Sequence, residues 1–271
     1  MHTASLTRQP LPVRRPPLDL SEVPQRWLDN SLLASTISDA VNLLFPHGER
    51  FFVRSVRAFE KQVTSPDLRA QLRGFYGQEG SHAREHERYF DILRDQGHEF
   101  DEFLKSFNKF IRTVEGATPD SWNLAATAAV EHFTAIMAEH AIVEGTLDGA
   151  HPAMKELLLW HAAEEIEHKA VAFDVLQEVD PRYSVRVIGL VVSSLVLSVW
   201  WAKATSLLLK QREATWDQLR GELRSAKKGP SRKKIWKDVF LKGVLSYLKP
   251  DFHPNNNPGH EEAQAYLSAM A

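Results

Sequence analysis

The chain has 271 residues, of which 43% are hydrophobic and 25% are charged, and its formal net charge at pH 7 is −2. This is the composition of an ordinary globular protein, and the nearly balanced charge excludes a strongly acidic or basic partner for the chain as a whole. The absence of cysteine excludes disulfides, thiolate metal sites and cysteine nucleophiles, and it fits a reducing cytoplasm.

The chain begins with a segment that has no helical pattern. Residues 11–17 are rich in proline and arginine, and no apolar core of a signal peptide precedes them. Because proline-rich segments favour extended conformations, we expect residues 1–30 to form an extended arm over a folded domain. The first helix of that domain is predicted in two pieces, residues 31–44 and 47–63, because a proline and a glycine interrupt its pattern.

Three longer helices are predicted next. The second helix covers residues 65–97, because proline is favoured in the first turn of a helix and glycine just after its end. The third helix is predicted over residues 120–147. The fourth covers residues 152–179 and stops before an Asp-Pro pair.

The links between these helices indicate the fold. The first and second helices are joined by a short link, as are the third and fourth, so each pair is predicted to form an antiparallel hairpin. Residues 97–120 form one long connection between the hairpins and have a short helical pattern of their own. Two hairpins joined by one long crossover have ferritin-like connectivity. We therefore expect an all-α fold, with a ferritin-like four-helix bundle over residues 31–180.

The chain changes character after the fourth helix. Residues 187–202 contain no charged side chain and would span about 24 Å as a helix, which is less than the hydrocarbon core of a membrane. This additional hydrophobic helix is predicted either to be buried on the bundle or to contact lipid. A basic helical segment follows, because residues 203–250 carry 13 Lys or Arg and 4 Asp or Glu. We expect residues 181–250 to pack on the bundle, or to contact a membrane surface through residues 187–250, and residues 251–271 to form a polar tail.

The second and fourth helices carry charged residues on the stripe that should face the core. An isolated buried carboxylate costs of order several kcal/mol, so such residues need partners. In both helices the apolar stripe is interrupted at mid-length by a Glu-x-x-His pair, which places a carboxylate and an imidazole one turn apart on one face. The pairs are Glu79 with His82 and Glu165 with His168. This arrangement is typical of metal binding.

The other two helices each offer one carboxylate on the core stripe. These are Glu49 and Glu131, which precede the glutamates of the two pairs by 30 and 34 residues. One Glu from each of two helices, with a Glu-x-x-His from each of the other two, forms the di-iron carboxylate arrangement. Two divalent cations would neutralise the four carboxylates. Oxygen and imidazole ligands without thiolate favour two iron ions, with manganese or zinc as alternatives.

Each candidate residue also has a structural interpretation. The residues of the two pairs could form a buried salt-bridge network instead of binding metal. Glu49 could instead be a negative charge that the helix dipole favours at the start of a helix. His161 lies one turn before Glu165 and is either a further ligand or a residue that supports the ligands. His86 is expected to support the ligands or to hydrogen-bond a substrate.

At these residues the chain resembles the ferritin-like di-iron oxygenases and oxidases. The pattern His161-x-x-x-Glu165-x-x-His168 is similar to the arylamine N-oxygenase branch, in which the fourth helix supplies an extra histidine. Residues 45–52 and 248–254 resemble a bacterial family known as predicted metal-dependent hydrolases, and this likeness covers most of the chain. The resemblance to the arylamine N-oxygenase branch implies seven metal ligands: Glu49, Glu79, His82, Glu131, His161, Glu165 and His168.

We expect an enzyme that uses two iron ions and an electron donor to activate O2 and oxidise a small, lipophilic substrate. One alternative is a hydrolase in which two metal ions activate water, and another is a non-enzymatic iron-binding bundle. The basic segment has no recognition motif, so no nucleic-acid partner is expected. The sequence leaves open whether two copies of the chain form a homodimer. We place the protein in the cytoplasm, where the hydrophobic helix could attach it to the inner face of the membrane.

Overall fold

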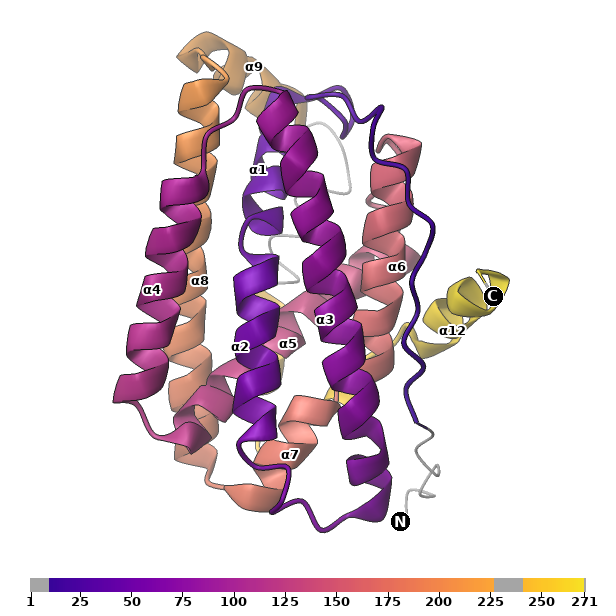
Figure 1. The fold of residues 1–271 in the computed structure, drawn as a ribbon, viewed down its shortest axis with the longest axis vertical. Coiled ribbons are helices and arrows are strands. Elements are labelled where there is room, and N and C mark those ends of the chain that lie inside the picture. Colours follow the sequence, from indigo (N-terminus) through magenta and orange to yellow (C-terminus); the bar gives the residue numbers. More distant parts are fainter. Residues whose placement is uncertain (1–9, 227–240, 271) are drawn as a thin grey trace.

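The computed structural model describes residues 10–226 and 241–270, and all regular secondary structure in these ranges is helical, as the all-α prediction expects (Figure 1). The elements are α1 (Leu32–Asn42), α2 (Phe45–Arg57), α3 (Pro66–Asp95), α4 (Asp101–Ala117), α5 (Asp120–Val143), α6 (Pro152–His168), α7 (Val171–Val179), α8 (Tyr183–Gln211), α9 (Trp216–Ala226), α11 (Gly243–Tyr247), the 3-10 turn η2 (Pro254–Asn256) and α12 (His260–Ala269).

The first three predicted helices are present, but two of their ends are wrong, and α5 ends at Val143 and not at residue 147. The first is interrupted as predicted and gives α1 and α2, but α2 ends at Arg57 and not at residue 63. Beyond its end the chain makes turns, with backbone bonds from Phe59 to Val56 and from Glu60 to Arg57 in place of helical ones. The helix α3 begins as expected, because the Ser65 side chain accepts a bond from a first-turn N–H and proline follows it.

The later part of the chain differs from the prediction in three places. The fourth predicted helix is two helices, α6 and α7, because the chain turns at Lys169 and Ala170. The connection of residues 97–120 holds a full helix, α4, whose phenylalanines pack on Trp200 of α8. The predicted polar tail contains α12, which buries Ala263 and Leu267 against the domain. The central part of the predicted basic segment, residues 227–240, lies outside the described residues.

Four helices enclose the interior in which the candidate site lies. The helix α2 packs against α3 and α5, and α6 packs against the same two helices. In Figure 1 α2 and α3 stand in front of α5 and α6, and α7 continues below α6. Because α2 and α3 form one hairpin and α5 and α6 the other, the middle of each helix faces the middle of the others.

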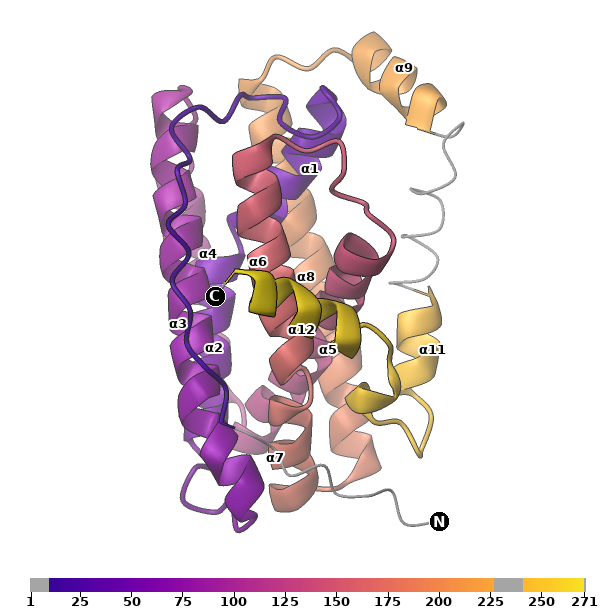
Figure 2. The ribbon, with the colours of Figure 1, turned by 90° about the vertical axis from the view of Figure 1, so that its right-hand side faces the viewer.

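The N-terminal arm is part of the folded structure. It runs along α3 on the side nearest α6 (Figure 2), and it buries Leu18, Leu20, Val23 and Trp27. Its polar groups meet the same two helices, because Arg14 binds Glu167 of α6 and the carbonyl of Pro12 accepts a hydrogen bond from Gln78 of α3. The arm therefore covers the seam between α3 and α6, close to the predicted ligands.

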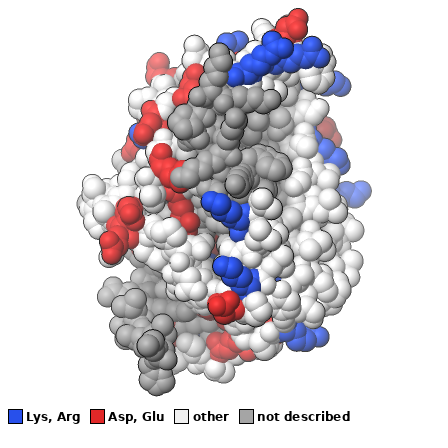
Figure 3. Space-filling view, turned by 180° about the vertical axis from the view of Figure 1, so that it is seen from behind, with Lys and Arg blue, Asp and Glu red and all other residues white. Residues whose placement is uncertain are grey.

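The helix α8 has one buried and one exposed face. It packs against α5 and α1, and the approach to α5 is so close that a Cβ on Gly189 would lie 2.6 Å from the backbone of Ala125. On the other face Val191 is 60% exposed and Leu195 65% exposed. Seen from behind, charged side chains gather along the left side and the top of the molecule, whereas the right-hand side is largely uncharged (Figure 3). Within the described ranges, α8 alone has the length and apolar composition to cross a membrane, and 33% of its most apolar stretch is buried.

Candidate metal centre

The structure brings all seven predicted ligand residues into one buried cluster. The helix α2 contributes one of them, α3 two, α5 one and α6 three. None of the seven is more than 4% exposed. The apolar stripes of the four helices face one another, so the polar residues that interrupt them at mid-length meet in the interior. The residues are Glu49, Glu79, His82, Glu131, His161, Glu165 and His168.

The cluster contains groups of ligand atoms that lie close enough to hold an ion. In each group the candidate atoms lie within 4.8 Å of one another. Two of the groups share only Glu79, so that its carboxylate lies between two separate sets of donors. The four groups are Glu49 with Glu79 and His82, Glu79 with Glu131 and His168, His82 with His161 and Glu165, and Glu49 with His86 and His161.

The hydrogen bonding of the carboxylates tests whether a cation fits. Both carboxylate oxygens of Glu49 and of Glu131 are buried and have no hydrogen-bond partner among the described residues. The same is true of Nδ1 of His82. A buried polar group without a partner costs about 1–3 kcal/mol, and more if it is charged. Cations among these atoms would satisfy them, so the donor set fits metal ions.

A neighbouring carboxylate orients His82. Its Nε2 lies 2.9 Å from Oε2 of Glu164, while its Nδ1 faces the cluster. A carboxylate at Nε2 holds the proton on that nitrogen and leaves the lone pair on Nδ1 for a metal. Glu164 is in turn bound by Arg14 of the N-terminal arm at 3.0 Å.

An amide orients His168 in the same way. Its Nδ1 lies 2.9 Å from Oε1 of Gln78, and its Nε2 lies 3.0 Å from Oε1 of Glu79. The side chain of Gln78 can only accept at this oxygen, because its Nε2 donates to the carbonyl of Pro12 and to Glu167. The proton of a neutral His168 therefore lies on Nδ1, and Nε2 is free to bind a metal.

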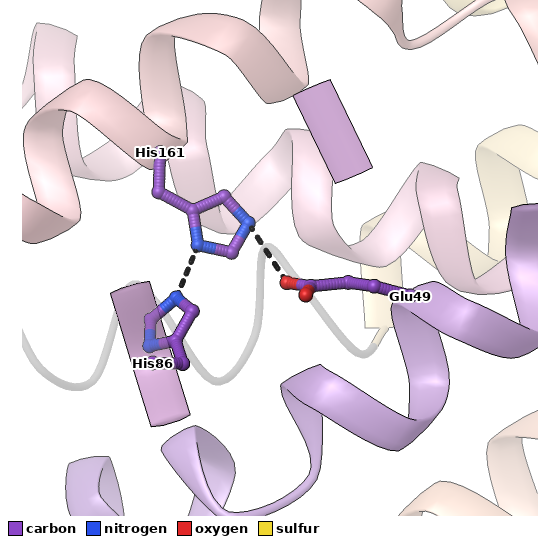
Figure 4. Close-up of side chains that lie close together, drawn as sticks. All are labelled: Glu49, His86 and His161. Carbon is purple, nitrogen blue, oxygen red and sulfur yellow. Dashed lines mark hydrogen bonds and ion pairs between the residues drawn. The ribbon is translucent and has the colours of Figure 1, made fainter. Parts of the chain in front are cut away.

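A chain of hydrogen bonds orients His161 (Figure 4). Nδ2 of Asn42 donates to the carbonyl of Ser38, so its Oδ1 accepts from Nδ1 of His86 at 2.7 Å. Nε2 of a neutral His86 then accepts from Nδ1 of His161 at 2.6 Å. The lone pair of a neutral His161 consequently points from Nε2 towards Glu165 at 3.0 Å and Glu49 at 3.7 Å. A lone pair that faces two carboxylates is unfavourable unless a cation lies between them.

Burial and mutual repulsion shift the acid–base behaviour of the cluster. Burial, together with neighbouring carboxylates, raises the pKa of Glu49 and of Glu131 well above its usual value. Burial raises the pKa of Glu79 to about 7. Burial alone would raise the pKa of Glu165 and lower that of His168, but their mutual attraction reverses both shifts. Without a metal, the cluster thus has protons to release when a cation binds.

The metal-free protein is expected to lose thermal stability as the pH rises from about 7 to about 8.5. In this range an unfolded chain has released the protons of its glutamates and histidines. Burial raises the pKa of Glu79 to about 7, so the folded chain still holds part of this proton at the start of the range, and the raised pKa values of Glu49, Glu131 and His168 act in the same direction. The folded state therefore binds more protons, and its stability falls as the pH rises. His82 and His86 do not oppose this, because burial lowers their pKa values and both are neutral in either state.

The measurement is the melting temperature of chelator-treated protein at several pH values in this range. The variant Glu131→Gln should give a flatter profile, because the amide has no proton to release. A metal-free profile that is flat, or that rises with pH, would contradict the prediction.

Several supporting residues are not among the predicted site residues. Glu164, Gln78 and Asn42 each bind an imidazole of the cluster, and Arg14 binds Glu164. Glu164 and Gln78 directly precede the ligand candidates Glu165 and Glu79, which is a weak signal because neighbours in a helix point in different directions. Arg14 gives no signal in the sequence, since 150 residues separate it from Glu164.

The fold and the site together define an all-helical protein with buried Glu and His clusters that could hold metal ions. Residues 12–257 match the model of the family described as "predicted metal-dependent hydrolase", and the chain belongs to this family. Comparisons with curated proteins and with solved structures gave no match. Membership of the family confirms the resemblance to it, while the arylamine N-oxygenase branch stays a prediction.

Proposed function

We propose that the chain is a two-metal enzyme with a ferritin-like bundle, and that iron is its preferred metal. The order of the elements supports this fold. The hairpin of α2 and α3 supplies Glu49 and then Glu79 with His82, and the hairpin of α5 and α6 supplies Glu131 and then Glu165 with His168. The residues between the hairpins, which include α4, form the one long crossover that a ferritin-like bundle has.

The observation that carries the proposal is the pair of ligand groups that share Glu79. One ion would be held by Glu49 and His82 and the other by Glu131 and His168, with Glu79 reaching both. We propose that Glu165 also reaches both ions and that His161 is the seventh ligand. Two divalent cations would balance the four carboxylates, so the filled site would be neutral in an interior that cannot stabilise net charge.

The surroundings of the site favour oxidation of an apolar substrate by O2. Aromatic rings cover the imidazoles, with Phe75 at 5.1 Å from His168 and Trp160 at 4.9 Å from His82, between ring centroids. These side chains exclude water from around the ligands, whereas a small apolar gas can enter. Two ferrous ions would supply the first electrons for the reduction of O2, and a separate donor would restore them.

Metal-dependent hydrolysis is the second candidate, because the description of the family names it. A two-metal site can lower the pKa of a bound water and stabilise a leaving oxygen. In this reaction the protein would work without O2 and with zinc or manganese in place of iron.

The test begins with metal-free, full-length protein that is loaded with Fe(II) in the absence of oxygen. We expect about two iron atoms per chain, followed by O2 uptake in proportion to the iron content once air and a chemical reductant are admitted. The variant Glu165→Ala should bind less iron and take up less O2. In parallel, protein loaded with zinc or manganese is tested anaerobically on p-nitrophenyl acetate and p-nitrophenyl phosphate.

The outcomes separate the candidates. Ester hydrolysis without O2, and no O2 uptake by the iron form, would replace oxidation with hydrolysis. Iron uptake far above two atoms per chain, with neither activity, would indicate iron storage. If none of iron, zinc and manganese binds, the two-metal site itself would be overturned.

A further inference from the structure

A partly open cavity lies beside the candidate metal centre. Its volume is about 170 Å³, and its walls come from α1, α2, α4, α5 and α8. The side chains that form most of the surface are phenylalanines and aliphatic residues. They include Phe45, Phe52, Phe107, Phe110, Ile188 and Val196. The cavity is therefore a built apolar space between elements that are far apart in the sequence.

The chemistry of the walls restricts what the cavity can hold. Among the residues that line it, Glu49 is the only one with an ionisable side chain, so no cation is present to bind a phosphate or carboxylate group. A cavity of about 150 Å³ lined by Leu, Ile and Phe stays dry and binds benzene. The present cavity is of similar size and character, which favours an uncharged apolar molecule.

The cavity reaches the metal centre through the first two turns of α2. Phe45 and Glu49 line the cavity, and the Phe45 ring also packs on the imidazoles of His86 and His161 at 4.6 and 4.8 Å between ring centroids. Glu49 belongs to two of the ligand groups. A molecule in the cavity would thus lie next to Glu49, itself a ligand candidate, and next to Phe45, which packs on His86 and His161.

The far side of the cavity reaches the surface. Trp122 and Val192 both line it, and they are 40% and 46% exposed. Both side chains are apolar, and Val192 belongs to the exposed face of α8. An apolar molecule could therefore enter here from solvent without crossing a charged surface.

Gly48 leaves open space on the cavity side of α2. A Cβ placed on this residue would have one neighbour within 4 Å, an atom of the Phe52 ring at 3.8 Å, and Gly48 is itself part of the cavity wall. Its φ is not positive, so backbone conformation does not require glycine here. Glycine within a helix is less stable than alanine. A side chain at this position would therefore occupy space that is open in the cavity.

We infer that this cavity binds the substrate of the proposed metal centre, that the substrate is an uncharged apolar molecule about the size of one aromatic ring, and that Gly48 keeps the space beside Glu49 open for it. The inference rests on the proposed function, because the substrate is defined by its place next to the metal ligands. It adds the class of substrate and a residue that sets the size limit.

The experiment measures binding, not turnover. Iron-loaded, full-length protein is titrated anaerobically with toluene and, separately, with phenyl phosphate, by calorimetry. We expect toluene to bind and phenyl phosphate to give no signal at the same concentrations. Gly48→Leu should weaken toluene binding at least tenfold and leave the iron content unchanged, because the leucine occupies the cavity and is not a ligand. The control is Gly116→Leu, at an exposed position of α4 with nothing near its Cβ, which should bind toluene like the parent protein.

A second variant covers the case in which Gly48→Leu does not fold. Ala126→Phe fills the cavity from α5, on a different wall from Glu49, and should also weaken toluene binding. Unchanged toluene binding in the folded variants, or equal binding of phenyl phosphate, would overturn the inference. Because iron content is measured separately, a parent protein that binds toluene but no iron would contradict the proposed function alone.

Discussion

Glu79→Gln is expected to abolish binding of both metal ions and to raise the thermal stability of the metal-free protein. The first effect follows because Glu79 is the residue shared by the two ligand groups, and an amide is a poor ligand for a divalent ion. The second follows because Glu79 is 1% exposed and lies among other carboxylates. Replacing one buried charge with a neutral group of the same shape removes repulsion and desolvation.

This pair of results distinguishes a metal site from a structural ion network. If Glu79 served only to pair with His168, the substitution would destabilise the protein, because an imidazolium would lose a partner. The measurements are iron content after anaerobic loading and the melting temperature of chelator-treated protein above pH 7. Glu85→Gln is the control, since Glu85 lies on the same helix but pairs with Arg84 and Arg88 outside the cluster. Full iron content in Glu79→Gln would contradict the prediction.

Arg212→Ala is expected to destabilise the fold by about 3–5 kcal/mol, since it would leave a buried carboxylate without its counter-charge. Asp39 of α1 is 0% exposed and binds Nη2 of Arg212 at 2.6 Å, just beyond the end of α8. The hydrogen bonds from Trp27 and Tyr89 to the same carboxylate would remain but carry no positive charge. For a chain of this size the loss corresponds to a fall in melting temperature of about 10 °C.

The control is the double variant Arg212→Ala with Asp39→Asn, measured by chemical unfolding. It should be more stable than Arg212→Ala alone, because no uncompensated charge stays in the interior. If the second substitution instead lowered stability further, the loss in Arg212→Ala would come from packing and not from the buried charge of Asp39.

The sequence indicated which residues share a face of each helix. Helical periodicity alone placed Glu79 and His82 on the core stripe of α3, and Glu165 and His168 on that of α6, because residues three apart in a helix point the same way. A buried charge is costly, so its presence on an apolar stripe carries information about function. Proline and glycine also marked the beginning and end of α3 correctly.

The sequence did not indicate which distant groups meet. Arg14, in an arm without periodic structure, reaches Glu164 behind His82, and Asn42 reaches His86. The break after His168 and the helix α12 were also missed. Each of these features depends on contacts with other parts of the chain, which local spacing does not encode.

By itself, then, the sequence determined the set of ligand candidates and the helices that carry them. Only the tertiary structure decided which nitrogen of each imidazole faces the cluster, because Glu164, Gln78 and His86 fix the protons of their partners from other elements. It also decided that an apolar cavity reaches Glu49, since helices from separate parts of the chain form its walls. The physical reason is that periodicity orders side chains along one helix, while packing between helices sets their neighbours in space.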